Sequence, residues 1–296
     1  MTKRKQGIFW PTDEHGVILN VGDEKYLAPP WDAAVHDIIA AYEQHIPNDT
    51  HSIYITGSVA RGAAVPKLSD INAFAVLEEA VDPELVMQDW IEKSEKAITR
   101  AHPEINGVTM ELWPHGSLFV EPEEFSVNAF ILKTHSVRLW GPNLAPELPD
   151  FTLSPAIANE DILLFYEDDF VEALDEIEMR SSKKNVRFWC RIICKQIIHT
   201  AFALVMLDEG KFTRDLPLAA ECFLRHYPQH KADIEQALQW ADRPSGDAFA
   251  VHDYLEHIAD WLMPACETWL DRYNPERCYP YGAEDCVEED GEFDEP

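Results

Sequence analysis

Positive charge is scarce in this sequence of 296 residues: 24 lysines and arginines stand against 54 aspartates and glutamates, a formal net charge of −30. A field of that sign repels duplex DNA and anionic lipid, because affinity for nucleic acid depends on neutralising phosphates. The composition therefore argues against general nucleic-acid binding and membrane binding. It leaves room for a local basic groove and favours cationic ligands.

Paired cysteines and long apolar runs are also lacking. None of the six cysteines belongs to a CxxC pair, and structural zinc needs four convergent ligands, so we expect reduced thiols. The most membrane-like stretch, 192–207, is interrupted by Lys195 and His199 and is too short to span a bilayer. The basic start, 1–6, is followed by no apolar core of signal-peptide length. We therefore expect a cytoplasmic protein.

The remaining composition is that of a folded protein, with 46% apolar residues, and the length suits about two domains. Residues 283–296 carry eight carboxylates and no base, a block that repels itself and stays solvated. The predicted organisation is an N-terminal extension (1–22), an α/β domain (23–142), a linker (143–155), a helical bundle (156–274) and an acidic flexible tail (275–296).

Apolar patterning predicts an α/β fold in the first half of the chain. The segments alternate between helical stripes and short, almost unbroken apolar runs, as expected of a small mixed sheet covered by helices. The predicted order is a helix at 31–46, strands at 52–56 and 71–77, a helix at 81–100 and a strand at 108–113.

Helical patterning dominates the second half, after the linker with its three prolines. This predicts an all-α bundle as the second domain. The predicted helices lie near 160–180, 181–208, 216–226, 230–241 and 250–273.

A glycine-serine turn follows the first predicted strand. Gly57 and Ser58 lie in this turn, where backbone N–H groups and a hydroxyl can closely approach phosphate oxygens. Arg61 and Lys67 add positive charge nearby. The turn is therefore a candidate phosphate-binding loop.

Carboxylates are expected beside this turn. Positions 70 and 72 point to the same face of the second strand, because strand side chains alternate. Glu111 points there too if its strand pairs alongside. Mg²⁺ takes carboxylate and phosphate oxygens, and a third carboxylate can deprotonate an acceptor hydroxyl. We predict a metal site formed by Asp70, Asn72 and Glu111, with Asp70 and Glu111 as catalytic residues.

These residues resemble the motif of the nucleotidyltransferase superfamily related to DNA polymerase β: Gly-Ser, a spacer, Asp-x-Asp/Glu, and a later carboxylate on a strand. The resemblance covers roughly residues 50–142, including the segment 132–141, and makes 23–142 a nucleotidyltransferase domain. With the helical second domain, the whole chain is similar to aminoglycoside adenylyltransferases of the streptomycin/spectinomycin type. The resemblance implies ATP and Mg²⁺ as cofactors and transfer of AMP to a hydroxyl acceptor.

Asn72 departs from that motif, because the family has its second metal-binding carboxylate at this position. An amide has nearly the same volume but lacks the negative charge that helps to hold Mg²⁺. We therefore expect catalysis to be weakened or lost. The asparagine is either natural, giving a nucleotide-binding protein with little activity, or an engineered inactivation.

The helical half offers two further candidates. Arg187, Arg191 and Lys195 recur every four residues on one helix face, where a cationic row could reach a triphosphate across a domain cleft or could merely be solvated. The acidic run 166–178 would suit a cationic acceptor such as an aminoglycoside, or could be the solvent-exposed face of a helix.

Three functions follow from these observations. The first is transfer of AMP from MgATP to a hydroxyl-bearing, cationic small molecule. The second is nucleotide binding or sensing without turnover, as an interaction module. The third is a toxin–antitoxin nucleotidyltransferase that modifies RNA or protein, although the net charge disfavours RNA.

Overall fold

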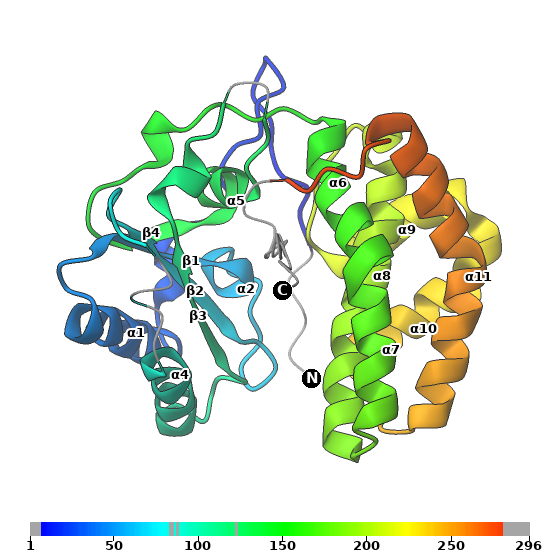
Figure 1. Ribbon diagram of the computed structural model, residues 1–296, viewed down its shortest axis with the longest axis horizontal. Helices are drawn as coiled ribbons and strands as arrows, with labels where there is room; N and C mark the ends of the chain where they lie inside the picture. Colours follow the sequence, from blue (N-terminus) through cyan, green and yellow to red (C-terminus); the bar gives the residue numbers. More distant parts are fainter. Residues whose placement is uncertain (1–6, 83–85, 87–88, 122–123, 281–296) are drawn as a thin grey trace, which may run out of the picture.

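The computed structural model describes residues 7–82, 86, 89–121 and 124–280 of the chain. An α/β domain and a helical domain lie side by side, and residues near the N-terminus run between them (Figure 1). The expected fold class, a small mixed sheet with helices followed by a helical bundle, is confirmed. The predicted acidic stretch 283–296 lies outside the described residues.

A four-stranded mixed sheet of order β3-β2-β1-β4 forms the centre of the α/β domain. Strand β1 is antiparallel to both β2 and β4, whereas β2 and β3 are parallel. The first three strands match the predicted ones, and the four-residue β4 was not expected. The strands are β1 (Thr50–Thr56), β2 (Ile71–Leu77), β3 (Val108–Trp113) and β4 (Val137–Trp140).

Different elements cover the two faces of this sheet. Helices α1 and α4 pack against the face that carries Ile53, Ala73 and Met110. The opposite face carries Tyr54 and Phe74 and packs against α5, in a core shared with the helical domain. The helices are α1 (Asp32–His45), α2 (Gly57–Ala60), α4 (Trp90–Ala101) and α5 (Val127–His135). Helix α4 covers the later part of the helix predicted at 81–100, of which residues 83–85 and 87–88 lie outside the described residues, and α5 was not predicted.

The helical domain is built around α8. This helix contacts α6, α7, α9, α10 and α11. It has the length and hydropathy of a membrane span, but 67% of its most apolar window is buried inside the protein, so these side chains form core. The helices are α6 (Pro155–Leu164), α7 (Phe170–Met179), α8 (Lys183–Glu209), α9 (Leu216–His226), α10 (Lys231–Asp242) and α11 (Ala248–Tyr273).

Shorter turns connect these elements. A π-helical turn joins α6 to α7, and such turns often mark functional positions in helices. The π turn is η4 (Phe165–Asp169), and the 3₁₀ turns are η1 (Glu24–Leu27), η2 (His115–Leu118), η3 (Ala145–Glu147) and η5 (Pro228–His230).

Gly141 follows β4, and its surroundings show how closely this edge strand packs against β1. Its φ is +76°, and a Cβ there would lie 2.3 Å from the carbonyl oxygen of His51 and 2.8 Å from Cα of Ser52. Both neighbours are backbone atoms, so we expect Gly141→Ala to lower the free energy of unfolding by roughly 3 kcal/mol. Gly107→Ala is the control, because a Cβ there meets nothing within 4 Å. Urea unfolding of both variants checks this, and equal losses would contradict it.

Candidate functional site

The turn at Gly57 and the side chain of Asn72 lie against each other. Gly57 has a φ of +77°, which favours glycine, and a Cβ there would lie only 2.9 Å from Nδ2 of Asn72. The sheet register causes this contact, because Asn72 is opposite Thr56, the last residue of β1. The structure therefore brings the glycine-serine turn and position 72 together, as the sequence predicted.

Glu111 lies on the predicted face of the sheet but too far along it. In the parallel pair of β2 and β3, Asn72 is opposite Thr109, and Glu111 is opposite Phe74. Asp70 immediately precedes β2, so Glu111 lies four residues further along, or about 13 Å. The register therefore separates Glu111 from Asp70 along the sheet. The metal site of Asp70, Asn72 and Glu111 stays a prediction.

Aromatic residues surround the Glu111 carboxylate instead. Its Oε2 accepts a 2.8 Å hydrogen bond from Nε1 of Trp113, and the Trp113 ring stacks on Phe74 at a centroid distance of 3.5 Å. In the described part of the chain, no group of three or more histidine, cysteine, aspartate or glutamate side chains is placed to hold a metal ion. These residues do not fit the Mg²⁺ that the motif implied.

Arg61 follows α2 directly and is half-buried. Its guanidinium lies over the ring of Trp10 at 5.1 Å from the centroid. Burial, and then the nearby charge of Arg214, lowers the pKa of Arg61 to about 10, although the charge of the Asp215 carboxylate acts in the opposite direction. Within the described ranges, no carboxylate comes within ion-pair distance of it. A half-buried guanidinium without such a partner has unused capacity to bind an anion.

Arg214 comes from the helical domain, in the turn between α8 and α9. Its Nη1 donates to both carboxylate oxygens of Asp161, at 2.8 and 2.7 Å. Burial alone would lower the pKa of Arg214, but the carboxylates of Asp161 and Glu160 raise it above its usual value. Arg214 therefore stays charged close to Arg61.

Two buried histidines lie beside these arginines. Burial, followed by the charges of Arg61 and Arg214, holds the pKa values of both His135 and His199 well below the usual range. Lys195 adds a smaller effect on His199. Nδ1 of His199 is buried and has no hydrogen-bond partner among the described residues.

We call these five side chains, three cations and two neutral histidines, the cationic cluster: Arg61, His135, Lys195, His199 and Arg214. Of these five residues, the predicted site included Arg61 and Lys195. The four-residue spacing of Lys195 and His199 could have placed them on one helix face. The sequence gives no signal that α2, α5, α8 and the α8–α9 turn converge.

The other predicted basic residues lie away from this cluster. Arg191 donates to the carbonyl oxygen of Asp242 at the end of α10, and Arg187 lies against Gly246. Lys67 is exposed, with a left-handed backbone (φ 67°). Of the predicted cationic row, only Lys195 is close to the buried charges.

Half-buried carboxylates lie next to the cluster on the helical side. Burial, and then the charge of Asp161, raises the pKa of Glu160 to about 7. Burial likewise raises the pKa of Asp169 to about 6, although Gln196 donates a 2.9 Å hydrogen bond to it. These groups, Glu160, Asp161 and Asp169, form what we call the acidic cluster. Raised pKa values mean that a cation bound there would stabilise the ionised carboxylates.

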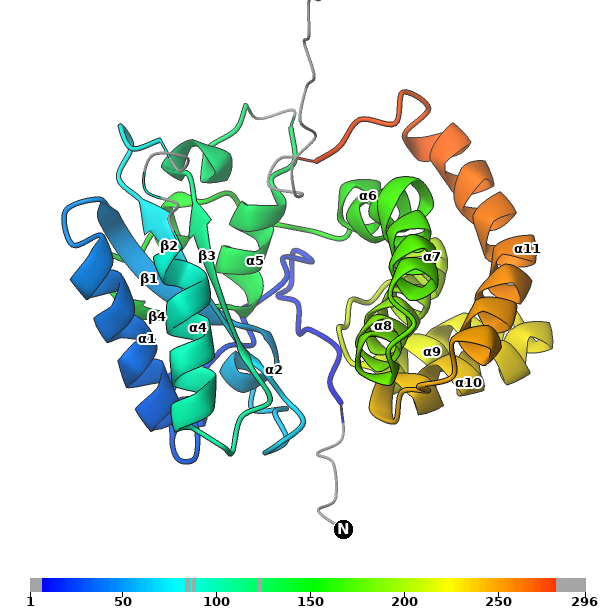
Figure 2. The ribbon, with the colours of Figure 1, turned by 60° about the horizontal axis from the view of Figure 1, so that its bottom comes forward.

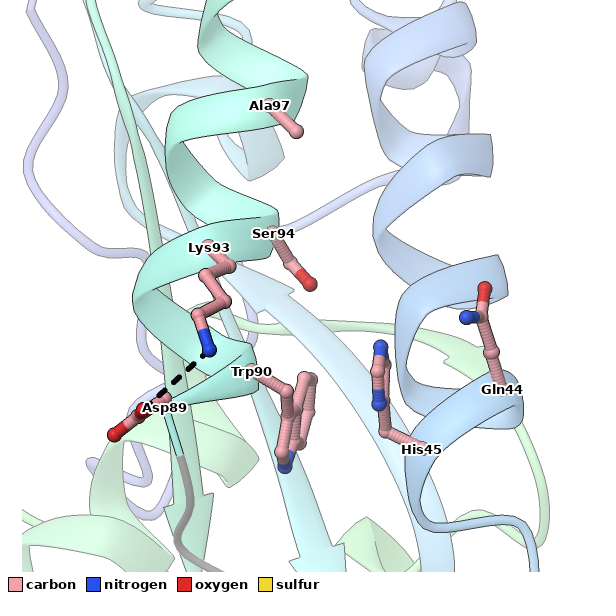
Figure 3. A pocket seen from close by; sticks show the side chains of 7 residues that line it. All are labelled: Gln44, His45, Asp89, Trp90, Lys93, Ser94 and Ala97. Carbon is pink, nitrogen blue, oxygen red and sulfur yellow. Dashed lines mark hydrogen bonds and ion pairs between the residues drawn. The ribbon is translucent and has the colours of Figure 1, made fainter.

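Two cavities lie elsewhere. The first, about 920 Å³, is an open space between α1 and α4 beside the stacked rings of His45 and Trp90 (Figure 3). It is therefore on the opposite face of the sheet from Asn72 and Glu111. The second, about 260 Å³, lies beside Tyr54 and β4. Neither includes a residue of the cationic or acidic cluster.

Comparison with known proteins supports the fold. No protein-family model matches the sequence, and no curated protein matches it. Among solved structures, the chain is similar to the crystal structure of spectinomycin adenyltransferase AAD(9) from Enterococcus faecialis with ATP and spectinomycin. The identity is 15%, the TM-score is 0.51, and the match covers 78% of this chain and 98% of the other. The similarity shows an adenyltransferase-like fold.

The raised pKa of Glu160 predicts a pH-dependent stability. The pKa of Glu160 is about 7 in the folded state against 4.5 for the ordinary side chain. Between these pH values, the folded protein therefore keeps a proton on Glu160 that the unfolded chain has released. This stabilisation is full below pH 4.5 and is lost as the pH rises through 7. We expect Glu160→Gln to be more stable than the parent at pH 8 by roughly 2 kcal/mol, with a much smaller difference at pH 5.

The control is Glu167→Gln, which changes an exposed carboxylate in the same region. Thermal unfolding of the three proteins from pH 5 to 8 measures the effect. A constant difference between parent and Glu160→Gln across this range would contradict the prediction.

Proposed function

We propose that this protein binds ATP between its two domains, with the phosphates at the cationic cluster and the Gly57–Ser58 turn. The observation that carries the proposal is the pair of half-buried guanidiniums, Arg61 and Arg214, one from each domain. Their mutual repulsion is relieved when an anion lies between them. The fold supports this, because the similar adenyltransferase structure was solved with ATP.

Each residue has a distinct part in this proposal. Arg61 supplies a guanidinium with no carboxylate within ion-pair distance in the described chain. Arg214 is oriented by its ion pair with Asp161, which partly neutralises its charge. Lys195 extends the positive charge along α8. Nδ1 of His199 has no hydrogen-bond partner in the described residues, and it can donate to a phosphate oxygen in the neutral tautomer that carries its proton on Nδ1. Gly57 lets the backbone approach the phosphates closely.

We further propose that AMP transfer is weakened or lost in this chain. Asn72 lacks the negative charge of a metal-binding carboxylate, and Thr109 is the residue opposite it on β3. Asp70 is then left without the carboxylate partners that Mg²⁺ and an acceptor hydroxyl require. The function that fits is nucleotide binding on an adenyltransferase-like scaffold.

The acidic cluster favours a cationic small molecule with hydroxyl groups as the second ligand. Glu160 and Asp161 lie next to Arg214, and Asp169 is close to Glu160, so a cation bound there would be beside the proposed phosphate site. A cation would also offset the repulsion that raises the pKa of Glu160. Spectinomycin in the similar adenyltransferase structure is consistent with this class of ligand.

The role of Arg61 is tested by Arg61→Gln. Loss of one charge-assisted contact to phosphate should weaken ATP binding about tenfold, or by about 1.4 kcal/mol. Arg243→Gln is the control, because the Arg243 side chain is 82% exposed and lies outside the cluster. Isothermal titration calorimetry of both variants, with circular dichroism to verify folding, provides the measurement. Unchanged affinity in a folded Arg61→Gln protein would refute the proposed site.

The metal hypothesis is tested by rebuilding the carboxylates. We expect ATP to bind the parent about equally well with Mg²⁺ or with EDTA, because the donor set is incomplete. The double variant Asn72→Asp/Thr109→Asp places two carboxylates opposite each other, so it should bind ATP at least about threefold tighter in Mg²⁺ than in EDTA. Asn72→Asp alone is the matched control. A parent that needs Mg²⁺ for ATP binding would contradict the prediction.

A further inference from the structure

The segment between the two domains, residues 7–21, is folded and pinned on both sides. We call it the N-terminal strap, and both ribbon views show it in blue between the α/β and helical domains (Figures 1 and 2). It contains a small hairpin, in which Thr12 bridges Ile18 and the Asp13 carboxylate accepts from the backbone N–H groups of His15 and Val17. The strap is therefore an ordered element.

On the helical side, the strap contacts the turn that carries Arg214. The backbone N–H of Trp10 donates to the carbonyl oxygen of Phe212 at 2.8 Å, and Oγ1 of Thr213 donates to the carbonyl oxygen of Ile8 at 2.8 Å. A Cβ on Gly7 would lie 2.1 Å from Cγ of Asp215, so the strap backbone lies directly against that carboxylate.

On the α/β side, the strap contacts Arg61 and its surroundings. Nε1 of Trp10 donates to the carbonyl oxygen of Thr134 at 3.2 Å, and the Trp10 ring meets His135 edge-on at 5.8 Å. The same ring lies over Arg61 at 5.1 Å. Trp10 is only 5% exposed, so its ring is buried among Arg61, His135 and Phe212.

We propose that the N-terminal strap is an internal cover that shields the cationic cluster from solvent and from polyanions, with the Trp10 ring lying where it blocks access to Arg61. The part that concerns polyanions rests on the proposed function.

The charge balance at Arg61 supports a cover that can be displaced. An indole face is a weaker partner for a buried guanidinium than an anion, since cation–π attraction replaces neither a full charge nor hydrogen bonds. A phosphate oxygen at Arg61 would supply both a negative charge and a hydrogen-bond acceptor. Trp10 withdrawal therefore has a compensating interaction once a polyanion is present.

The first test is the reactivity of Arg61 toward phenylglyoxal, an arginine-selective reagent, read by mass spectrometry of the Arg61 peptide. Arg61 should react at least tenfold more slowly than exposed Arg243 in the parent. It should approach the rate of Arg243 in Trp10→Ala. Thr213→Val is a milder second variant that removes the bond to Ile8 and should raise the rate several-fold. Leu19→Ala is the control, because this strap side chain is 42% exposed.

The second test is binding of tripolyphosphate to the same proteins by calorimetry. We expect Trp10→Ala and Thr213→Val to bind it at least fivefold tighter than the parent and Leu19→Ala. A parent in which Arg61 already reacts like Arg243 would overturn the cover, as would folded variants with unchanged reactivity. Raised reactivity with unchanged or weaker binding would also overturn it. Raised reactivity with no binding by any protein would uphold the shielding of Arg61 and refute the proposed function.

Discussion

The proximity of Arg61 and Arg214 is the constraint on which the rest of the site depends. Two guanidiniums from different domains are kept close in a half-buried environment, where like charges repel more strongly than in water. Asp161 neutralises Arg214, while the indole of Trp10 lies over Arg61. The boundary between the domains is thus held together around a local excess of positive charge.

This local excess runs against the charge of the whole chain. With a net charge of −30, the protein repels most anions from its surface, so an anion-binding site must be local and built from converging elements. Four separate segments supply the cationic cluster, and the acidic cluster lies directly beside it. The adjacent clusters of opposite sign would let one site hold a polyanion and a cation together, which neither cluster could do alone.

The sequence predicted the elements better than their alignment. The unbroken apolar run 71–77 and the motif residues Gly57 and Ser58 indicated the strand and the turn correctly, because both signals are local. The short β4 and helix α5 gave weaker local signals and were missed. The position of Glu111 depends on the register between β2 and β3, which is fixed by contacts such as Ile71 N–H to the carbonyl oxygen of Gly107. Nothing in the apolar pattern of either strand specifies that contact.

The cationic cluster could not be predicted for a related reason. Only Lys195 and His199 share an element, and the approach of Arg61 and Arg214 depends on how two domains pack. Conversely, the regular row of Arg187, Arg191 and Lys195 suggested a shared role. Arg191 instead donates to the last residue of α10, and Arg187 lies against Gly246 in the loop after α10. Helical spacing identifies residues on one face without showing what that face meets.

The asparagine at position 72 and the two half-buried arginines bear on the same physical requirement. A triphosphate held in a closed site needs positive charge, whether from Mg²⁺ or from the protein. With Asn72 beside the turn and Glu111 about 13 Å along the sheet from the level of Asp70, the donor set for a metal is incomplete. Arg61, Arg214 and Lys195 can supply that charge without a metal. In the proposed function, these fixed cations would hold the nucleotide but would not provide the base that activates an acceptor hydroxyl. The proposal therefore separates nucleotide binding from transfer on this scaffold.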